Sequence, residues 1–140
     1  MKAFVEHANI TVTNLERTIH FLQTAMPDFQ IRHQGKNTKR WCHLGTEDSY
    51  LALQEPEPEH VQTCQREAYN DLGLNHVGFV VDNINEVSQR LIAAGFRNDD
   101  EVMDETYRKR CYVFDQDGIE WEFVEYVVTE PSLKNSYEEA

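Results

Sequence analysis

The stretch "VEHANITVTNLERTIHFL" (residues 5–22) predicts a strand followed by an amphipathic helix. Apolar Ile10 and Val12 alternate with polar residues, and this period of two is typical of a strand with one buried face. Thr13 and Glu16 have the spacing of a capping box, so we expect the helix to begin there. The helix carries one apolar stripe, formed by Leu15, Ile19, Leu22 and Met26. The stretch is therefore a strand-and-helix unit that can bury one face.

A second stretch, "LNHVGFVVDNINEVSQRL" (residues 74–91), has the same order of elements. A shift of 69 residues aligns the two stretches and places His7 on His76. We expect Asn83 to cap the second helix and Gly95 to end it, because these residue types favour those positions. The chain thus contains an internal repeat of a strand and a helix.

The hairpins that follow the two helices also align, now with a shift of 70 residues. Residues 38–55 match residues 108–125 in hydrophobic phase, with few identical positions. This alignment pairs Arg40 with Arg110, and structural pairing with carboxylates is the interpretation we favour for both. Small loop insertions reconcile the two shifts.

The repeat predicts an α+β fold made of two tandem βαβββ modules. We expect one domain over residues 1–126, with modules at about 4–55 and 74–126, a connector at 56–73 and an acidic tail at 127–140. Each helix should cover the apolar face of a mixed sheet and leave a polar face opposite. The two sheets are therefore expected to be concave cups.

Composition limits the classes of function. The chain has 140 residues, long enough for one domain with a core, and its net charge of −12 argues against a nucleic-acid partner. An acidic surface confers solubility, or favours a cationic ligand. We find no apolar run near the length of about 20 residues that a membrane span needs, and no signal peptide. The three cysteines form no CxxC pair, so we expect a reducing, cytoplasmic location.

Two histidines and a carboxylate are the candidates for a metal site. His7 and His76 are repeat-equivalent, and Glu120 and Glu122 alternate with apolar residues, so both carboxylates should point into the cup. Imidazole and carboxylate ligands suit Fe, Zn, Ni, Mn or Co. A single histidine at a strand end is usually a surface or hydrogen-bonding residue, and it is the duplication that favours a shared role as ligands.

Four other residues share the inward phase of their strands. They either line a pocket or are ordinary solvated residues of the cup. These pocket candidates are Asn9, Tyr50, Gln54 and Tyr126.

Four segments of the chain resemble the vicinal oxygen chelate superfamily, over residues 4–126: "EHANITVTNLERTIHFL", "SYLALQEP", "NHVGFVVDN" and "DQDGIEWEFVE". That superfamily includes glyoxalase I, extradiol dioxygenases, methylmalonyl-CoA epimerase, and fosfomycin- and bleomycin-resistance proteins. The last segment is similar to the family's "DPDGNxIEL" hairpin, whose Glu is a metal ligand. The resemblance implies paired βαβββ modules, His7, His76 and Glu122 as ligands, and chemistry on a substrate with two adjacent oxygens.

One position departs from the family pattern. Many metal-using members have a Glu in the last strand of the first module, where this chain has Ala52. Gln54 faces the same way, but the register disfavours it as a replacement. Three protein ligands would leave three open positions, as in non-haem Fe(II) dioxygenases, and would remove a proton-shuttling base of isomerase chemistry.

Three functions are compatible with these features. The first is a metalloprotein with lyase, isomerase or dioxygenase chemistry, in which Glu122 and Glu120 are the catalytic candidates and Glu120 acts as an acid–base or supporting group. The second is a metal-free small-molecule or drug-binding protein of the bleomycin-resistance type. The third is a non-catalytic interaction domain, which no motif favours. We expect a small-molecule ligand and a homodimer, without nucleic acid or membrane partners.

Overall fold

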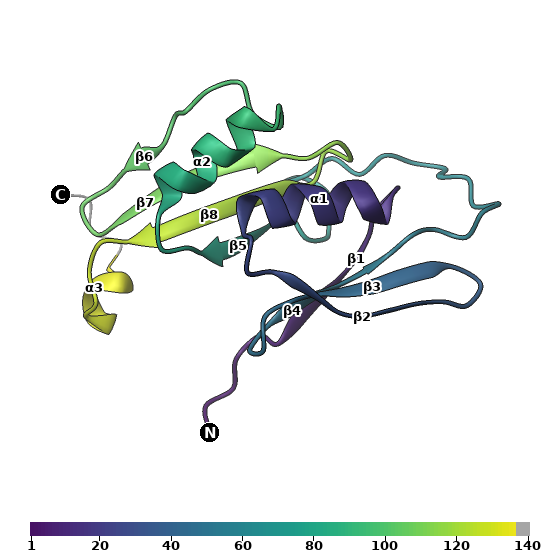
Figure 1. Ribbon diagram of the computed structural model, residues 1–140, viewed down its shortest axis with the longest axis horizontal. Helices are drawn as coiled ribbons and strands as arrows, with labels where there is room; N and C mark the ends of the chain where they lie inside the picture. The colour runs from purple at the N-terminus through teal and green to yellow at the C-terminus, as the bar shows by residue number, and fades with distance from the viewer. Residues whose placement is uncertain (137–140) are drawn as a thin grey trace. The chain divides into compact units, whose positions relative to one another are not determined.

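Four strands and one helix build the first unit of the chain, Met1–Glu67, in the computed structural model, which describes residues 1–136 (Figure 1). Strand β1 pairs parallel with β4, β4 pairs antiparallel with β3, and β3 pairs antiparallel with β2, giving the order β1-β4-β3-β2. The bounds are β1 His7–Thr11, α1 Leu15–Ala25, β2 Gln30–Lys36, β3 Arg40–Gly45 and β4 Tyr50–Gln54.

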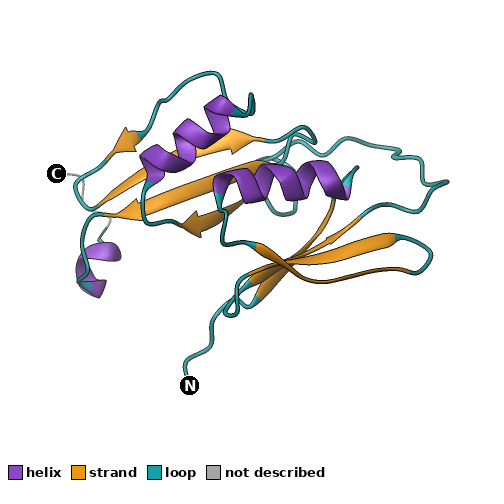
Figure 2. Cartoon of the chain, in the orientation of Figure 1, coloured by secondary structure: helices purple, strands orange, loops and turns teal. Residues whose placement is uncertain are grey.

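The second unit, Ala68–Ala140, has the same element order and the equivalent sheet order, β5-β8-β7-β6 (Figure 2). Its elements are β5 His76–Val80, α2 Ile84–Ala93, β6 Met103–Asp104, β7 Arg108–Phe114, β8 Glu120–Tyr126 and α3 Pro131–Lys134. Helix α3 lies in the predicted acidic tail, and residues 137–140 of that tail lie outside the described residues. The predicted fold class, α+β with two mixed four-stranded sheets, is confirmed.

Each unit has its own apolar core between helix and sheet. In the first unit Phe21 and Leu22 of α1 are fully buried, as is Leu44 of β3; in the second unit Leu91 of α2 and Trp121 of β8 are fully buried. Burial of one such side chain contributes about 1.5–3 kcal/mol. We call the sheet surface opposite each helix the open face.

Asparagine caps both long helices. Asn14 Oδ1 accepts a hydrogen bond from Arg17 N at 2.9 Å, and Asn83 Oδ1 accepts one from Glu86 N at 3.2 Å. The prediction that Asn83 caps α2 is confirmed, but the capping box expected at Thr13 is wrong because α1 begins one residue later. Asparagine and threonine both cap well, so the residue types alone did not decide between adjacent positions.

A glutamate at the end of each sheet also binds the helix of its own unit. Glu55 Oε1 accepts from Leu15 N at 3.0 Å, and Glu125 Oε2 accepts from Ile84 N at 2.9 Å. Both donors are first-turn amides that have no partner inside their helix, and the positive end of the helix favours the carboxylate. Helix and sheet are therefore connected in the same way in both units.

The strand registers establish which repeat positions are equivalent. Asn9 lies opposite Ala52 in the first sheet, and Gly78 lies opposite Glu122 in the second. Asn9 and Gly78 are related by the shift of 69, and Ala52 and Glu122 by the shift of 70. Ala52 therefore does occupy the position at which the second unit has Glu122.

The pairing of Arg40 with Arg110 is wrong. Trp41 lies opposite Gln54, and Arg110 lies opposite the equivalent Val124, so Trp41 is the counterpart of Arg110. The shift of 69 continues through β3 and β7, and the extra residue lies in the following turn. Sequence alone could not locate this extra residue, because the two hairpins are short and similar in polarity.

Candidate functional site

Polar side chains gather on the open face of the second sheet. Trp121 and Phe123 of β8 are fully buried, so alternation directs Glu120 and Glu122 to the other side of the strand. Strand β5 runs parallel to β8 and places His76 opposite Glu120. Three predicted site residues of this unit therefore lie together.

His76 and Glu122 are in direct contact. Nε2 of His76 lies 3.0 Å from Oε2 of Glu122, and the two side chains are 31% and 12% exposed. Gly78 leaves space for this carboxylate, because a Cβ on Gly78 would lie 3.3 Å from Oε2. A larger residue at position 78 would crowd the carboxylate of Glu122.

Tyr69 contacts the other side of the imidazole. Its hydroxyl donates to Glu120 Oε1 at 2.8 Å and lies 3.1 Å from His76 Nδ1. Its backbone has a φ of 68°, which is uncommon for a residue with a side chain, and its N–H donates to the side chain of Asn75 at 2.8 Å. The hydrogen bond to Glu120 raises the pKa of Tyr69, so the hydroxyl keeps its proton.

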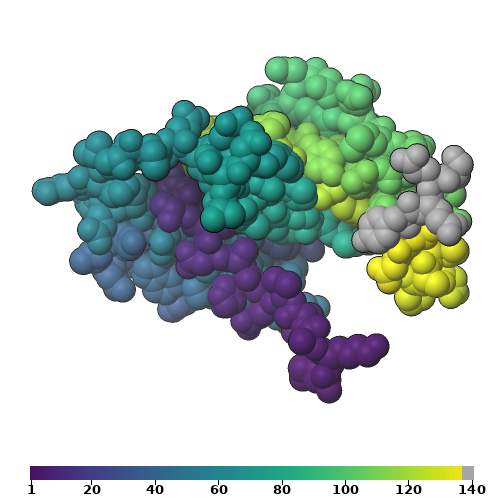
Figure 3. Space-filling view, turned by 180° about the vertical axis from the view of Figure 1, so that it is seen from behind, coloured from purple at the N-terminus to yellow at the C-terminus, as the bar shows by residue number. Residues whose placement is uncertain are grey.

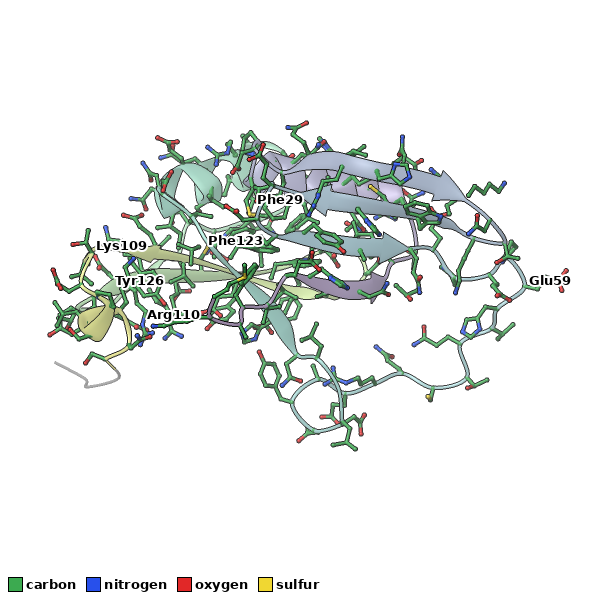
Figure 4. All side chains as sticks on the ribbon, turned by 90° about the horizontal axis from the view of Figure 1, so that it is seen from below. Phe29, Glu59, Lys109, Arg110, Phe123 and Tyr126 are labelled. Atoms are coloured by element: carbon green, nitrogen blue, oxygen red, sulfur yellow. The ribbon has the colours of Figure 1, made fainter. Side chains whose placement is uncertain are left out.

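Tyr112 and Arg110 of β7 hold the second oxygen of Glu122. The Tyr112 hydroxyl donates to Glu122 Oε1 at 2.8 Å, and Arg110 Nη1 donates to that hydroxyl at 3.1 Å. Figure 4 labels Arg110 on this sheet. Burial, with the hydrogen bond to Glu122, raises the pKa of Tyr112 to about 12. Glu105 anchors the guanidinium of Arg110, and hydrogen bonds from Arg110 and Arg108 lower the pKa of Glu105. Glu122 is thus oriented by a chain of donors.

The remaining site candidate of the second unit, Tyr126, lies next to the tail. Its side chain has the same phase on β8 as Glu120 and Glu122, and the ammonium group of Lys134 lies 5.3 Å from its ring centre. A role in lining a pocket stays a prediction.

The other candidates lie on the open face of the first unit. The ring of His7 stacks on Tyr50 at 4.8 Å, and its Nδ1 lies 3.0 Å from Oε2 of Glu6, in the exposed segment before β1 (Figure 3). Asn9 pairs with Ala52, which is 6% exposed, and Gln54 donates to the hydroxyl of Thr11 at 3.3 Å. Each of these residues thus has a partner within its own unit.

Tyr69, Tyr112 and Arg110 were not predicted as site residues. Tyr112 could have been found from alternation along β7, where it lies between buried Cys111 and Val113, and the register places it opposite Glu122. Tyr69 lies in the predicted connector, and no periodic signal marks it. Within residues 1–136, no group of three or more His, Cys, Asp or Glu side chains is arranged to hold a metal ion, and no helix could span a membrane.

Comparisons with known proteins agree with this fold. A model of the Glyoxalase/Bleomycin resistance protein/Dioxygenase superfamily matches residues 5–123. A glyoxalase family protein from Bacillus cereus superposes with a TM-score of 0.73 at 19% identity, covering 91% of this chain and 97% of that one. FosX, a fosfomycin resistance protein from Listeria monocytogenes in complex with Mn(II) and sulfate, gives 0.65 at 15% identity, covering 97% and 100%. No curated protein sequence matches the chain significantly.

Proposed function

We propose that this chain, which belongs to the Glyoxalase/Bleomycin resistance protein/Dioxygenase superfamily, is a metalloprotein that acts on a small substrate with vicinal oxygens. His76 and Glu122 would hold the divalent ion. His7 would be the third protein ligand, and its assignment rests on its repeat equivalence to His76 and on the family resemblance. The reaction class is lyase, isomerase or dioxygenase chemistry.

The contact between His76 and Glu122 carries this proposal. Tyr69 donates its single hydroxyl proton to Glu120, so its oxygen is left to accept from Nδ1–H of His76. With one proton on the ring, Nε2 presents a lone pair toward Glu122 Oε2 at 3.0 Å, and these two acceptors then need either a metal ion or a second imidazole proton.

The donor set fits a transition metal. Imidazole and carboxylate suit Fe, Zn, Ni, Mn and Co, and the similar FosX structure is a complex with Mn(II).

The surrounding residues would orient the two ligands. Tyr69 and Glu120 hold His76 by Nδ1, and Tyr112 holds Glu122 by Oε1, which leaves Nε2 and Oε2 directed at each other. Such hydrogen bonds fix the tautomer of a ligand and raise its basicity. A divalent ion supplies Lewis acidity that polarises a substrate oxygen. Glu120 is the candidate acid–base group.

Metal-free binding of a small molecule is the second candidate function, and Ala52 favours it. The position equivalent to Glu122 in the first unit has no ligand atom, as in a site that has lost its metal. In that case a proton on His76 Nε2 would satisfy Glu122. We also propose a homodimer, which the resemblance allows because members of the family build their sites within one chain or between two.

Removal and return of metal tests the proposed function. Metal-free protein titrated with Mn(II), Fe(II), Co(II), Ni(II) or Zn(II) is expected to gain thermal stability. At 100 times the dissociation constant the gain is about 2.7 kcal/mol, or about 8 °C for a chain of this size. Differential scanning fluorimetry measures it, and an unchanged midpoint with all five ions would favour the metal-free function.

Tyr69→Phe is expected to weaken metal binding while the fold persists. The substitution removes only the hydroxyl that contacts His76 and Glu120, and loss of such a supporting group costs about 10–100-fold in metal affinity. Competition with a fluorescent chelator measures the affinity. Tyr107→Phe, which removes a hydroxyl elsewhere in the same unit, should bind metal like wild type, and equal affinity in both variants would show that Tyr69 does not support the site.

A further inference from the structure

Five aromatic or imidazole rings form a continuous row across the open face of the first sheet. Neighbouring ring centres are 4.8–5.3 Å apart, and Trp41 and Tyr50 are both half-buried. From β2 through β3 and β4 to β1, the row consists of His33, Trp41, His43, Tyr50 and His7. His7 and Tyr50 are stacked and the other three pairs are tilted, and all four distances lie in the range of interacting aromatic pairs.

A glycine makes room for the ring of Trp41. A Cβ on Gly35 would lie 2.7 Å from that ring, so the absence of a side chain at this position lets the ring lie close to the sheet. A second glycine, Gly45, allows the backbone of the turn to approach β3, because a Cβ there would lie 2.2 Å from the carbonyl oxygen of Ser49.

A β-bulge adds a cation to the row. The register shifts between Ile31 and His33, so Arg32 is the extra residue of β2. Its guanidinium carbon lies 4.4 Å from the centre of the Tyr50 ring, a cation–π contact. Bulges of this kind redirect a side chain and are common beside functional sites.

The strands of this sheet carry a net positive charge, whereas the whole chain carries a net negative charge. The chain has 25 Asp and Glu residues, yet none lies on strands β1 to β4. Arg40 of the same sheet forms ion pairs with Glu16 and Glu55, whereas within the described part of the chain no carboxylate lies within ion-pair distance of Arg32. Arg32 is therefore a cation available to a ligand.

We propose that the row binds a planar aromatic anion, such as an aromatic carboxylate. Its ring would stack against Trp41, and its acidic group would pair with the guanidinium of Arg32, which lies over the Tyr50 ring and whose planar donor set matches a carboxylate. If this ligand is also the substrate, its binding here rests on the proposed function. The substrate would then be an aromatic acid with neighbouring oxygens. The binding step itself requires no metal.

The test uses metal-free full-length protein and 1-naphthoate as the probe. Calorimetry is expected to detect saturable binding, and the NMR signal of the Trp41 indole N–H should shift. The signal of Trp121, which is fully buried in the second unit, should stay in place. Binding of 1-naphthylmethylammonium at equal or higher affinity would overturn the proposal, because it would mean that the rings select cations.

Arg32→Gln is expected to weaken naphthoate binding about tenfold or more, because a charge-assisted contact is lost. Arg32 is exposed, so the variant should fold normally. Lys36→Gln removes the same charge from the same strand and should bind like wild type. Equal affinity in all three proteins, or no naphthoate binding, would mean that the rings only stabilise neighbouring strands. Because metal is absent throughout, a failed metal titration leaves this result unaffected.

Discussion

Glu122→Gln is expected to lose metal binding by about 100-fold or more while the protein remains folded. Loss of a supporting residue already costs 10–100-fold, and the substitution replaces a charged ligand by a neutral amide. The amide keeps the shape of the side chain and can still accept from the Tyr112 hydroxyl, so little change in stability is expected. Calorimetric titration of metal-free protein measures the affinity.

Glu125→Gln is the matched control for this experiment. Glu125 lies on the same strand and carries the same charge, but it binds the first turn of α2 on the other side of the sheet. It should lower stability slightly and leave metal affinity within about twofold of wild type, because the effect of a distant charge is screened. Similar losses of affinity in both variants would show that only the net charge matters.

Asp115→Ala is expected to reduce the free energy of unfolding by about 3 kcal/mol. Asp115 lies in the turn before β8 and accepts hydrogen bonds from Asp117 N at 2.8 Å, Ile119 N at 3.0 Å and Trp121 Nε1 at 2.9 Å. Trp121 is fully buried, so water cannot replace the lost acceptor of its indole N–H. Urea denaturation measures the change, as a lower midpoint at constant slope.

The Trp121→Phe variant separates the energetic contribution of the Asp115–Trp121 hydrogen bond from that of the other hydrogen bonds in the turn. In Trp121→Phe protein the same Asp115→Ala change should cost at least about 1 kcal/mol less, since the donor is already gone. Asp100→Ala, at an exposed loop position, should change stability by less than about 0.5 kcal/mol. A cost for Asp115→Ala as small as that of Asp100→Ala would contradict the assigned role.

The sequence allowed the fold to be predicted because each element carried its own periodic signal. Ile10 and Val12 marked β1 by alternation, and Gly95, with a φ of 76°, marks the end of α2 as expected. Strand β6 has two exposed residues, Met103 and Asp104, and is too short to show a period. Its position depends on pairing with β7, which is not a local property.

Only part of the candidate site could be predicted from the sequence in the same way. Alternation along β8 was enough to bring Glu120 and Glu122 to one face, because Trp121 between them is strongly apolar. Tyr69 reaches His76 through a left-handed backbone conformation in an irregular segment, and no residue pattern predicts that. Arg32 faces the ring row only because of a bulge, which changes the phase that alternation would assign.

The most direct test of the proposed metal site is the metal content of the purified protein. The protein would be purified anaerobically, without chelator or nickel affinity chromatography, and measured by plasma mass spectrometry beside Glu122→Gln and His7→Ala. Near-stoichiometric transition metal is expected in wild type and none in either variant. Iron would favour oxygen chemistry among the proposed reaction classes. Wild-type protein that contains no metal, even after reloading with Fe, Mn, Ni, Co and Zn, would contradict the proposed site.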